Sequence, residues 1–271
     1  MRARRALFYV VLLLGAAVAT FPMLWMLSAS LMPAGEASTY PPRLLPREIT
    51  FEHYATLFTR LNLGRYFVNS TIIAVAVTAI SLVVNSMAGY AFAKLRFRAR
   101  DRFFRILATG LVIPVQVSML PLFLLMKQLG LINTYWGVII PGMASIFGIF
   151  LIRQYAFSIP DDLLDAARID GAGEFRIYWS IVVPTITPIL ATLAIWTFLS
   201  TWNDFMWPLI VLSDESHYTL PVALANLVGE HVQDTELMMA GSVLTILPVM
   251  LVFLFLQRYY IQGIMMGSTK G

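Results

Sequence analysis

Two apolar segments of the chain are joined by the stretch Ser158-Ile-Pro-Asp-Asp-Leu-Leu-Asp-Ala-Ala-Arg-Ile-Asp-Gly-Ala-Gly-Glu-Phe-Arg-Ile-Tyr-Trp-Ser-Ile-Val-Val-Pro184. Its first residues have the features of a helix start, because Ser158 with an acid three residues later fits a capping box and Pro160 is tolerated in a first turn. Gly171 supplies the stop, since glycine readily adopts the left-handed conformation just past a helix. The stretch therefore predicts a short helix from Ile159 to Asp170.

One side of this predicted helix is made mostly of small residues. Four residues recur at the three-and-four spacing of a single helix face: Leu163, Ala166, Ala167 and Asp170. The two alanines leave room for another surface to approach closely. The pattern alone is equally typical of a plain surface helix between two spans.

The sequence on either side of this stretch is that of a membrane protein. Of the 271 residues, 59% are hydrophobic and 13% are charged, whereas about a quarter of the residues of a soluble domain are charged. Crossing the hydrocarbon core takes about 20 mostly apolar residues per helix. Six segments are long enough: 6–31, 67–93, 103–126, 135–156, 181–212 and 237–256. We predict an all-α membrane protein with six transmembrane helices, of which the first is not cleaved as a signal peptide.

The distribution of Lys and Arg sets the expected orientation. With the N-terminus inside, the inner segments carry 14 Lys and Arg residues and the outer segments carry 5, which together are the 19 of the sequence. Cytoplasmic loops are the ones enriched in these residues. Both termini and the Ser158 to Pro184 stretch are therefore expected in the cytoplasm, and the cluster from Lys94 to Arg100 serves as a topology anchor.

Composition also argues against several other classes of protein. The chain has no cysteine, which excludes disulfides, thiolate metal sites and cysteine nucleophiles. None of its three histidines has a histidine partner at helical spacing, so neither a metal site nor catalytic residues are expected. The net charge of +4 comes from basic residues scattered among apolar blocks, which argues against a nucleic-acid partner.

The residues from Asp165 onward resemble a known signature. Asp165-Ala-Ala-Arg-Ile-Asp-Gly-Ala172, followed at the matching distance by Ile181 and Pro184, is similar to the EAA motif of ABC importer permeases. That motif reads Glu-Ala-Ala, two residues, Asp-Gly-Ala, and later Ile-x-Leu-Pro. This sequence differs at two positions, because aspartate at 165 replaces the leading glutamate and Val183 stands in place of the leucine.

The resemblance implies a role for this stretch. In the family it forms the coupling helix, which sits in a cleft of a cytoplasmic ATPase and transmits nucleotide-driven closure to the transmembrane helices. The implied ATPase-coupling residues are Asp165, Ala166, Ala167, Asp170, Gly171, Ala172 and Pro184. We call residues 157–184 the coupling loop.

The resemblance extends over nearly the whole chain and narrows to the carbohydrate-uptake, maltose-type branch, specifically its second, shorter permease subunit. The phrases that carry it include Asn85-Ser-Met-Ala-Gly-Tyr-Ala-Phe-Ala-Lys94 and Trp202-Asn-Asp-Phe-Met-Trp-Pro-Leu-Ile210. It implies a MetI-like, type I importer core of five helices in 67–271, preceded by a first helix and outer loop in 1–66. The implied cargo is a sugar or oligosaccharide, with glycerol phosphate or another polyol as the alternative.

The same resemblance implies a multi-subunit complex in a bacterial inner membrane. Its other members are a second homologous permease, two ABC ATPase subunits and an extracytoplasmic solute-binding protein, all surrounded by membrane lipid. This chain has no G-x-x-x-x-G-K-[ST] phosphate loop. We therefore expect no cofactor in this chain, with ATP and Mg²⁺ bound by the partner ATPase, and we do not expect the chain to be an enzyme.

An ion-coupled secondary transporter is the competing class. Such proteins normally have ionisable groups deep inside their spans, and the only clear acid inside a predicted span is Asp204. Counting from Pro184 at the inner side, it lies about 30 Å along the helix. That position is near the outer interface, which argues against proton or sodium coupling.

The residues around Asp204 form the best candidate for a substrate path. Aromatic faces and amide or carboxylate groups suit the C–H faces and hydroxyls of a sugar. The candidate residues are Trp202, Asn203, Asp204 and Trp207. The alternative is a Trp/Tyr belt at the membrane interface, with a proline ending the helix.

Overall fold

The computed structural model describes residues 2–230 and 234–268, so His231 and Lys270 lie outside it. Every regular element in these residues is a helix. The predicted all-α fold is therefore confirmed. Because most residues are apolar, the backbone hydrogen bonds of each segment have to be satisfied inside that segment, which is the property that makes helices the usual spanning structure.

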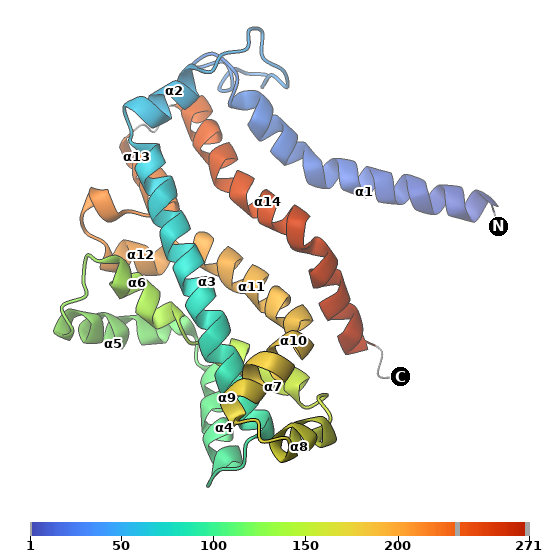
Figure 1. Ribbon diagram of the computed structural model, residues 1–271. Helices are drawn as coiled ribbons and strands as arrows, with labels where there is room; N and C mark the ends of the chain where they lie inside the picture. Colours follow the sequence, from blue (N-terminus) through green and yellow to red (C-terminus); the bar gives the residue numbers. More distant parts are fainter. Residues whose placement is uncertain (1, 231–233, 269–271) are drawn as a thin grey trace. The chain divides into compact units, whose positions relative to one another are not determined.

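The elements follow one another along the chain without long unstructured connections except in 30–51. The first half contains α1 (Arg2–Ala29), α2 (Glu52–Thr59), α3 (Leu63–Lys94), α4 (Arg100–Thr109), η1 (Gly110–Val112), α5 (Val115–Gln128), α6 (Tyr135–Gly142) and α7 (Ile146–Ala156). The second half contains α8 (Asp161–Ile169), α9 (Glu174–Ile177), η2 (Tyr178–Val182), α10 (Val183–Thr185), α11 (Thr187–Trp202), α12 (Met206–Val211), η3 (Glu215–His217), α13 (Leu220–Glu230) and α14 (Thr235–Ser268). Figure 1 labels the helices.

Four of the six predicted spans are found as long apolar helical segments, and bent helix pairs lie at the places of the other two. Within the described residues, four helical segments are long and apolar enough to cross a membrane: Leu7–Ala29, Leu63–Lys94, Tyr135–Ala156 and Thr235–Phe255. In two further places, two consecutive helical segments are long and apolar enough only when they are taken together. Arg100–Val112 and Val115–Gln128 meet at a bend of 108°, and Glu174–Thr185 and Thr187–Trp202 meet at a bend of 79°. The third and fifth predicted spans each correspond to one of these bent pairs.

The 108° bend lies where a proline predicts it. Pro114 has an extended backbone (φ −60°, ψ 133°) and is the residue just before α5. Because proline has no amide hydrogen, the hydrogen-bond ladder of η1 cannot continue through it and the helix breaks here. A second proline, Pro121, lies inside α5. With 14 residues, α5 is about 21 Å long, which is shorter than a hydrocarbon core of about 30 Å.

The chain divides into two compact units. The first consists of 1–66 and 220–248, and the second of 67–219 and 249–271. In the first unit a small core of Ala29, Met32 and Ala37 lies under the connection between α1 and α2, and the backbone amide of Ala37 donates to the buried Glu236 carboxylate at 2.6 Å. This hydrogen bond joins the connection between α1 and α2 to the first turn of α14.

The second unit holds two buried clusters of apolar residues, one along the first half of α3 and the other along its second half. One cluster surrounds Ile73, Met126 and Trp207, and the other surrounds Tyr90, Ile152 and Leu164. The second cluster includes residues of the coupling loop. The loop is thus packed on the same core that joins α3 to α7, α9 and α11.

Two glycines set the close approach of α3 and α7. A β-carbon on Gly89 would lie 2.7 Å from Ile152, and one on Gly148 would lie 2.7 Å from the Asn85 amide. The buried Asn85 side chain accepts a hydrogen bond from the backbone amide of Ser145 at 3.0 Å. Small residues and interhelical hydrogen bonds are the usual means of association in membranes, so α3 and α7 are held as one body.

Candidate functional site

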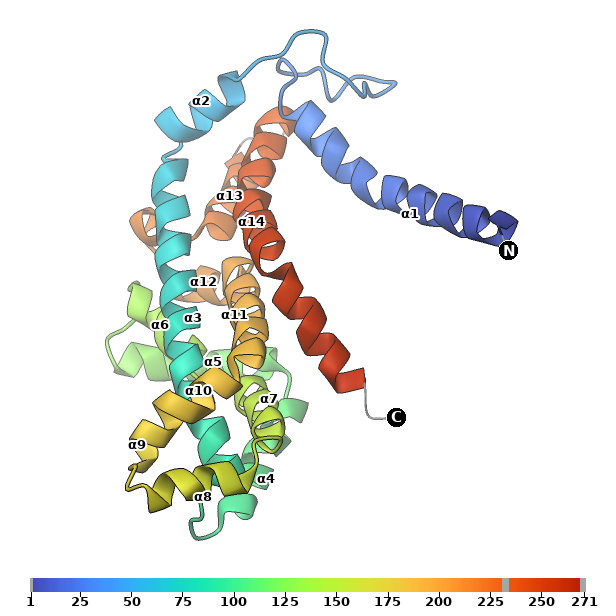
Figure 2. The same cartoon turned by 45° about the vertical axis from the view of Figure 1, so that its right-hand side comes forward.

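The coupling loop lies beside the end of α3 that carries Lys94 (Figures 1 and 2). Its main helix, α8, begins at Asp161 rather than at Ile159, and the predicted capping box is wrong. The Ser158 hydroxyl instead donates to the Tyr155 carbonyl at 2.7 Å, at the end of the preceding helix. Pro160 takes the N-cap position with an extended backbone, which leaves acidic residues in the first turn, where the positive end of the helix dipole favours them.

The other end of α8 confirms the predicted glycine stop. Gly171 has φ +81°, its amide donates to the Arg168 carbonyl at 3.0 Å, and the amide of Ala172 donates to the Ala167 carbonyl at 3.0 Å. These two hydrogen bonds form a Schellman motif, which satisfies carbonyls that the last turn of a helix leaves without partners. The chain reverses here and enters α9.

The faces of α8 differ from the predicted arrangement. Leu164 is buried and Ala167 is half-buried against the core, so Ala167 does not share the outer face with Leu163 and Ala166. The outer face carries Leu163, which is 45% exposed, and Ile169, which is 86% exposed. Phe175, which follows in α9, is 67% exposed. The coupling loop therefore presents large apolar side chains that the described part of the chain does not cover.

A lysine of α3 holds the beginning of the loop. The Lys94 ammonium donates to the Ile159 carbonyl at 2.6 Å and to the Asp161 carboxylate at 2.7 Å, and its side chain is only 7% exposed. The hydrogen bond from Lys94 lowers the pKa of Asp161 below the ordinary value of an aspartate. A nearly buried cation thus orients the first turn of α8.

Replacing Lys94 by methionine is expected to loosen the start of the coupling loop without unfolding α3. Hydrogen exchange of the amides in 159–164, measured in nanodiscs, should quicken, whereas the Arg105→Met variant should leave it unchanged. The pKa of Asp161 is lower in the folded protein than in the unfolded chain. The stability that its ion pair with Lys94 gives to the start of α8 is therefore complete above the ordinary aspartate pKa, and it is lost as the pH falls through the lower folded value. Protection of wild type should accordingly stay constant from pH 8 to pH 5, and a loss within that range would contradict the assignment.

A second set of ion pairs, centred on Arg168, holds the middle of the loop together. The Arg168 guanidinium donates to Asp165 at 2.6 Å and to Glu174 at 2.7 Å, and these two carboxylates raise its pKa above the ordinary value. The Tyr90 hydroxyl of α3 donates to Glu174 at 3.0 Å. Asp165 therefore has its ion-pair partner within the loop itself, which links α8 to α9 and both to α3.

The connection from the loop into α11 passes through a π-helical segment. The amide of Val183 donates to the Tyr178 carbonyl, five residues earlier, and the next residue is Pro184, which has no amide hydrogen to donate. Insertions of this kind relieve the clash between a proline ring and the preceding turn. The Tyr178 hydroxyl is 2.6 Å from the Ser86 hydroxyl of α3, so this segment too is tied to α3.

The candidate substrate-path residues lie together at the other end of α11 but differ in exposure. Trp202 is 1% exposed and stacks on Phe198, and the indole of the buried Trp207 donates to the Gly137 carbonyl at 3.1 Å. Asp204 is half-buried and accepts from the amide of Trp207 at 3.4 Å. Asn203 is exposed, with its amide donating to the Leu199 carbonyl at 2.8 Å.

Sequence reasoning missed the residues that hold the loop in place. Lys94 was placed in a topology anchor, and Tyr90, Glu174 and Ser86 were not singled out. Their partners lie 65 to 92 residues away along the chain. The available signal was the position of a lysine as the last residue of a long apolar segment, where it can reach a polar connection.

Comparison with known proteins adds an independent finding. Residues 85–265 match the family model described as a binding-protein-dependent transport system inner membrane component. The matched range includes the whole coupling loop, α11 and α12.

Individual relatives extend the similarity over nearly the full length. The arabinooligosaccharides transport system permease protein AraQ of Halalkalibacterium halodurans is 40% identical, over 94% of this chain and 92% of the relative. The lactose transport system permease protein LacG of Rhizobium radiobacter is 35% identical, over 97% and 95%. Among solved structures, a chain of a bacterial ABC transporter involved in the import of the acidic polysaccharide alginate is 28% identical with a TM-score of 0.85, covering 96% of this chain and 97% of that chain.

Proposed function

Because the chain belongs to the family of inner membrane components of binding-protein-dependent transport systems, we propose that it pairs with a second permease and moves a sugar or oligosaccharide through the membrane. As a member of this family it is a multi-pass translocation subunit of an ATP-driven ABC importer and not itself an enzyme. The observation that carries the proposal is the coupling loop, whose inner side is fixed to α3 and whose outer side is apolar and uncovered.

The loop has the two properties that a docking element needs. Its inner side is held by Lys94, Tyr90 and Ser86 through hydrogen bonds of 3.0 Å or less, so it cannot shift independently of α3. Its outer side exposes Ile169 and Phe175, and covering such side chains is favourable by about 25 cal/mol per Å² of apolar surface. An ATPase subunit with an apolar cleft is the partner that we assign to this face.

The docking roles are distributed over the residues that the motif names. Ala166 and Asp170 are exposed on the outer face, and Gly171 makes the turn that ends it. Ala167 and Ala172 face the core and position the turn. Asp165 fixes Arg168, and Pro184 follows the π-helical segment that leads into α11. ATP and Mg²⁺ are bound by the ATPase in this proposal.

The cargo is proposed from the chemistry named for the relatives. Two of those with the highest identity are described as permeases for arabinooligosaccharides and for lactose, which favours a sugar over glycerol phosphate. Within the candidate substrate path, Asn203 is the residue with an exposed amide, whereas Trp202 and Trp207 are packed inside the chain. We assign contact with sugar hydroxyls to Asn203 and the neighbouring Asp204, and a supporting role to the two tryptophans.

Reconstitution in liposomes tests the proposed function. The chain is combined with its second permease, two ATPase subunits and binding protein, and uptake of labelled oligosaccharides and of glycerol phosphate is compared. We expect oligosaccharide uptake that requires ATP and the binding protein and that persists when ionophores dissipate ion gradients. The purified chain alone should hydrolyse no ATP, and uptake by that chain driven by an ion gradient would contradict the proposal.

A further inference from the structure

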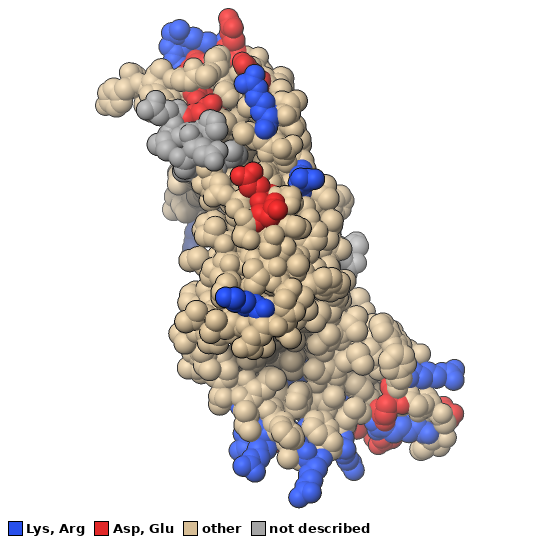
Figure 3. Space-filling model, turned by 90° about the vertical axis from the view of Figure 1, so that its left-hand side faces the viewer, with Lys and Arg blue, Asp and Glu red and all other residues tan. Residues whose placement is uncertain are grey.

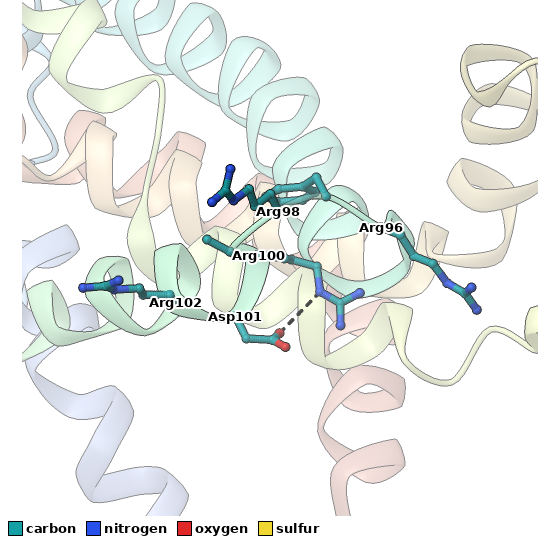
Figure 4. A pocket seen from close by; sticks show the side chains of 7 residues that line it. Arg96, Arg98, Arg100, Asp101 and Arg102 are labelled. Carbon is teal, nitrogen blue, oxygen red and sulfur yellow. Dashed lines mark hydrogen bonds and ion pairs between the residues drawn. The ribbon is translucent and has the colours of Figure 1, made fainter.

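The turn between α3 and α4 concentrates positive charge directly after a membrane span. Four arginines lie within seven residues, Arg96, Arg98, Arg100 and Arg102. Together with the residues between them they line a shallow hollow of about 610 Å³ (Figure 4). Figure 3 shows Lys and Arg gathered at this end of the second compact unit.

Most of this charge is not neutralised within the chain. Arg100 donates to Asp101 at 3.3 Å, and Asp101 also lies 3.7 Å from Arg153. Within residues 2–230 and 234–268, no carboxylate lies within ion-pair distance of Arg96, Arg98 or Arg102. Asp101 thus serves Arg100 and Arg153, and Arg96 lines a hollow that also contains Asp161 and Glu174. The guanidinium groups of Arg98 and Arg102 are left to the surroundings.

The shape of the turn goes beyond what a topology anchor requires. Orientation during insertion depends on the number of positive residues and not on their arrangement. Here Ala99 has a left-handed backbone with φ +64°, and its carbonyl accepts from the amides of Arg102 and Phe103 at 3.0 Å. The labelled side chains of Arg98 and Arg102 point to one side of this turn and that of Arg96 to the other (Figure 4), a spread that suits a layer of anions better than a single small ligand.

Apolar side chains accompany the arginines. Phe97 is 43% exposed, Phe103 is 57% exposed and Ile106 is 62% exposed. On the opposite side of α4, Phe104 is buried, with the Arg153 guanidinium 3.9 Å from its ring centre. Arginines followed by exposed Phe and Ile at the start of an apolar helix are typical of a segment that passes from the headgroup layer into the hydrocarbon.

The position of the turn, directly after the end of a candidate membrane span, also agrees with a place in the membrane interface. It follows Lys94, the last residue of α3, and that same lysine is bonded to the start of the coupling loop. We propose that the turn 95–99 and the first turn of α4 rest on the headgroup layer of the leaflet next to the coupling loop, and that Arg96, Arg98 and Arg102 bind anionic phospholipid there. Exposed aromatic and aliphatic side chains beside the charges favour lipid over an acidic protein surface, which would offer them no acyl chains.

An environment-sensitive fluorophore at position 99 can report the neighbouring lipid. The chain has no cysteine, so Ala99→Cys gives a single labelling site on an exposed residue. The labelled complex is placed in nanodiscs containing brominated phosphatidylglycerol or brominated phosphatidylcholine, and quenching is compared. The variants are Arg98→Gln with Arg102→Gln, and Arg98→Lys with Arg102→Lys as the matched control that keeps the charge.

Phosphatidylglycerol should quench the wild-type probe more strongly than phosphatidylcholine at equal mole fraction. Each arginine near an anionic surface contributes enough to change lipid selectivity about fivefold, so the double glutamine variant should lose most of it and the double lysine variant should keep most of it. High salt should reduce the selectivity of wild type, because the charges are exposed to water.

Three results would overturn the proposal. These are equal quenching by the two lipids in wild type, unchanged selectivity in the double glutamine variant, and weaker retention of the ATPase subunits by that variant with its lipid selectivity intact. The last result would assign the arginines to an acidic protein surface. Maleimide labelling of a Ser158→Cys site from each side of the membrane verifies that the glutamine variant keeps its topology.

Discussion

The Gly171→Leu variant is expected to insert and assemble normally and yet to lose about tenfold in ATP-driven uptake. Nothing lies within 4 Å of the place where a β-carbon would stand, so the side chain itself has room. The cost comes from the backbone, because φ is +81° and a left-handed conformation costs a residue with a β-carbon about 1–2 kcal/mol. An energy of that size changes the population of the correct turn by about tenfold, which detaches the outer face of α8 from the rest of the loop.

The matched control is Gly171→Asn, since asparagine adopts the left-handed region more readily than other residues with a β-carbon. It should retain most of the uptake. Uptake per ATP hydrolysed, measured in proteoliposomes with the binding protein, separates loss of coupling from loss of protein. Normal coupling in the leucine variant would show that the turn does not have to be maintained.

The Ile169→Asp variant is expected to bind the ATPase subunits about a hundredfold more weakly. Ile169 is 86% exposed, so the substitution should leave the fold of this chain intact. In a docked complex, however, the aspartate loses the roughly 1.5–3 kcal/mol that burial of an isoleucine contributes, and it adds the cost of an unpaired charge. Retention of ATPase subunits during purification, followed by a titration of ATPase onto the permease pair in nanodiscs, gives the measurement.

Two controls accompany this variant. Ile169→Leu keeps an apolar side chain of similar size and should bind normally. Leu45→Asp makes the same chemical change at a residue that is 76% exposed in the connection between α1 and α2, and it should not affect ATPase binding. If Ile169→Asp retained the ATPase as well as wild type does, the apolar outer face of α8 would have no part in docking.

The sequence predicts the helices of the fold, but it predicts only one of the two breaks between them. Long apolar segments predict spans because each must cover the same hydrocarbon thickness. The break before α5 was predictable from Pro114, since proline disrupts the helix locally. The break at Ile186, after α10, was not identified, although Pro188 in the first turn of α11 is a local signal for it.

In the coupling loop, too, features with a local cause could be predicted and features that depend on distant residues could not. Gly171 was predictable as the helix stop, because the requirement for a left-handed residue is local to the turn. The start was misplaced because the nearby Tyr155 carbonyl takes the hydrogen bond of Ser158 and because Pro160 already provides the extended residue before the helix. The bonds of Lys94 and Tyr90 cross 65 to 84 residues, and a single sequence carries no signal of such pairings.

The attachment of the loop to α3 has a mechanical consequence. From Lys94 to Asn69 the helix covers about 38 Å at 1.5 Å per residue, and the Asn69 amide donates to the Ser216 and Tyr218 carbonyls at 3.0 and 2.9 Å. If α3 pivots as a rigid rod about its Lys94 end, a tilt of about 5° carries Asn69 through about 3 Å. If the proposed ATPase partner rotates the Lys94 end slightly, the Asn69 end thus moves by about the length of a hydrogen bond. The segment that Asn69 holds would have to move with it, or these hydrogen bonds would break.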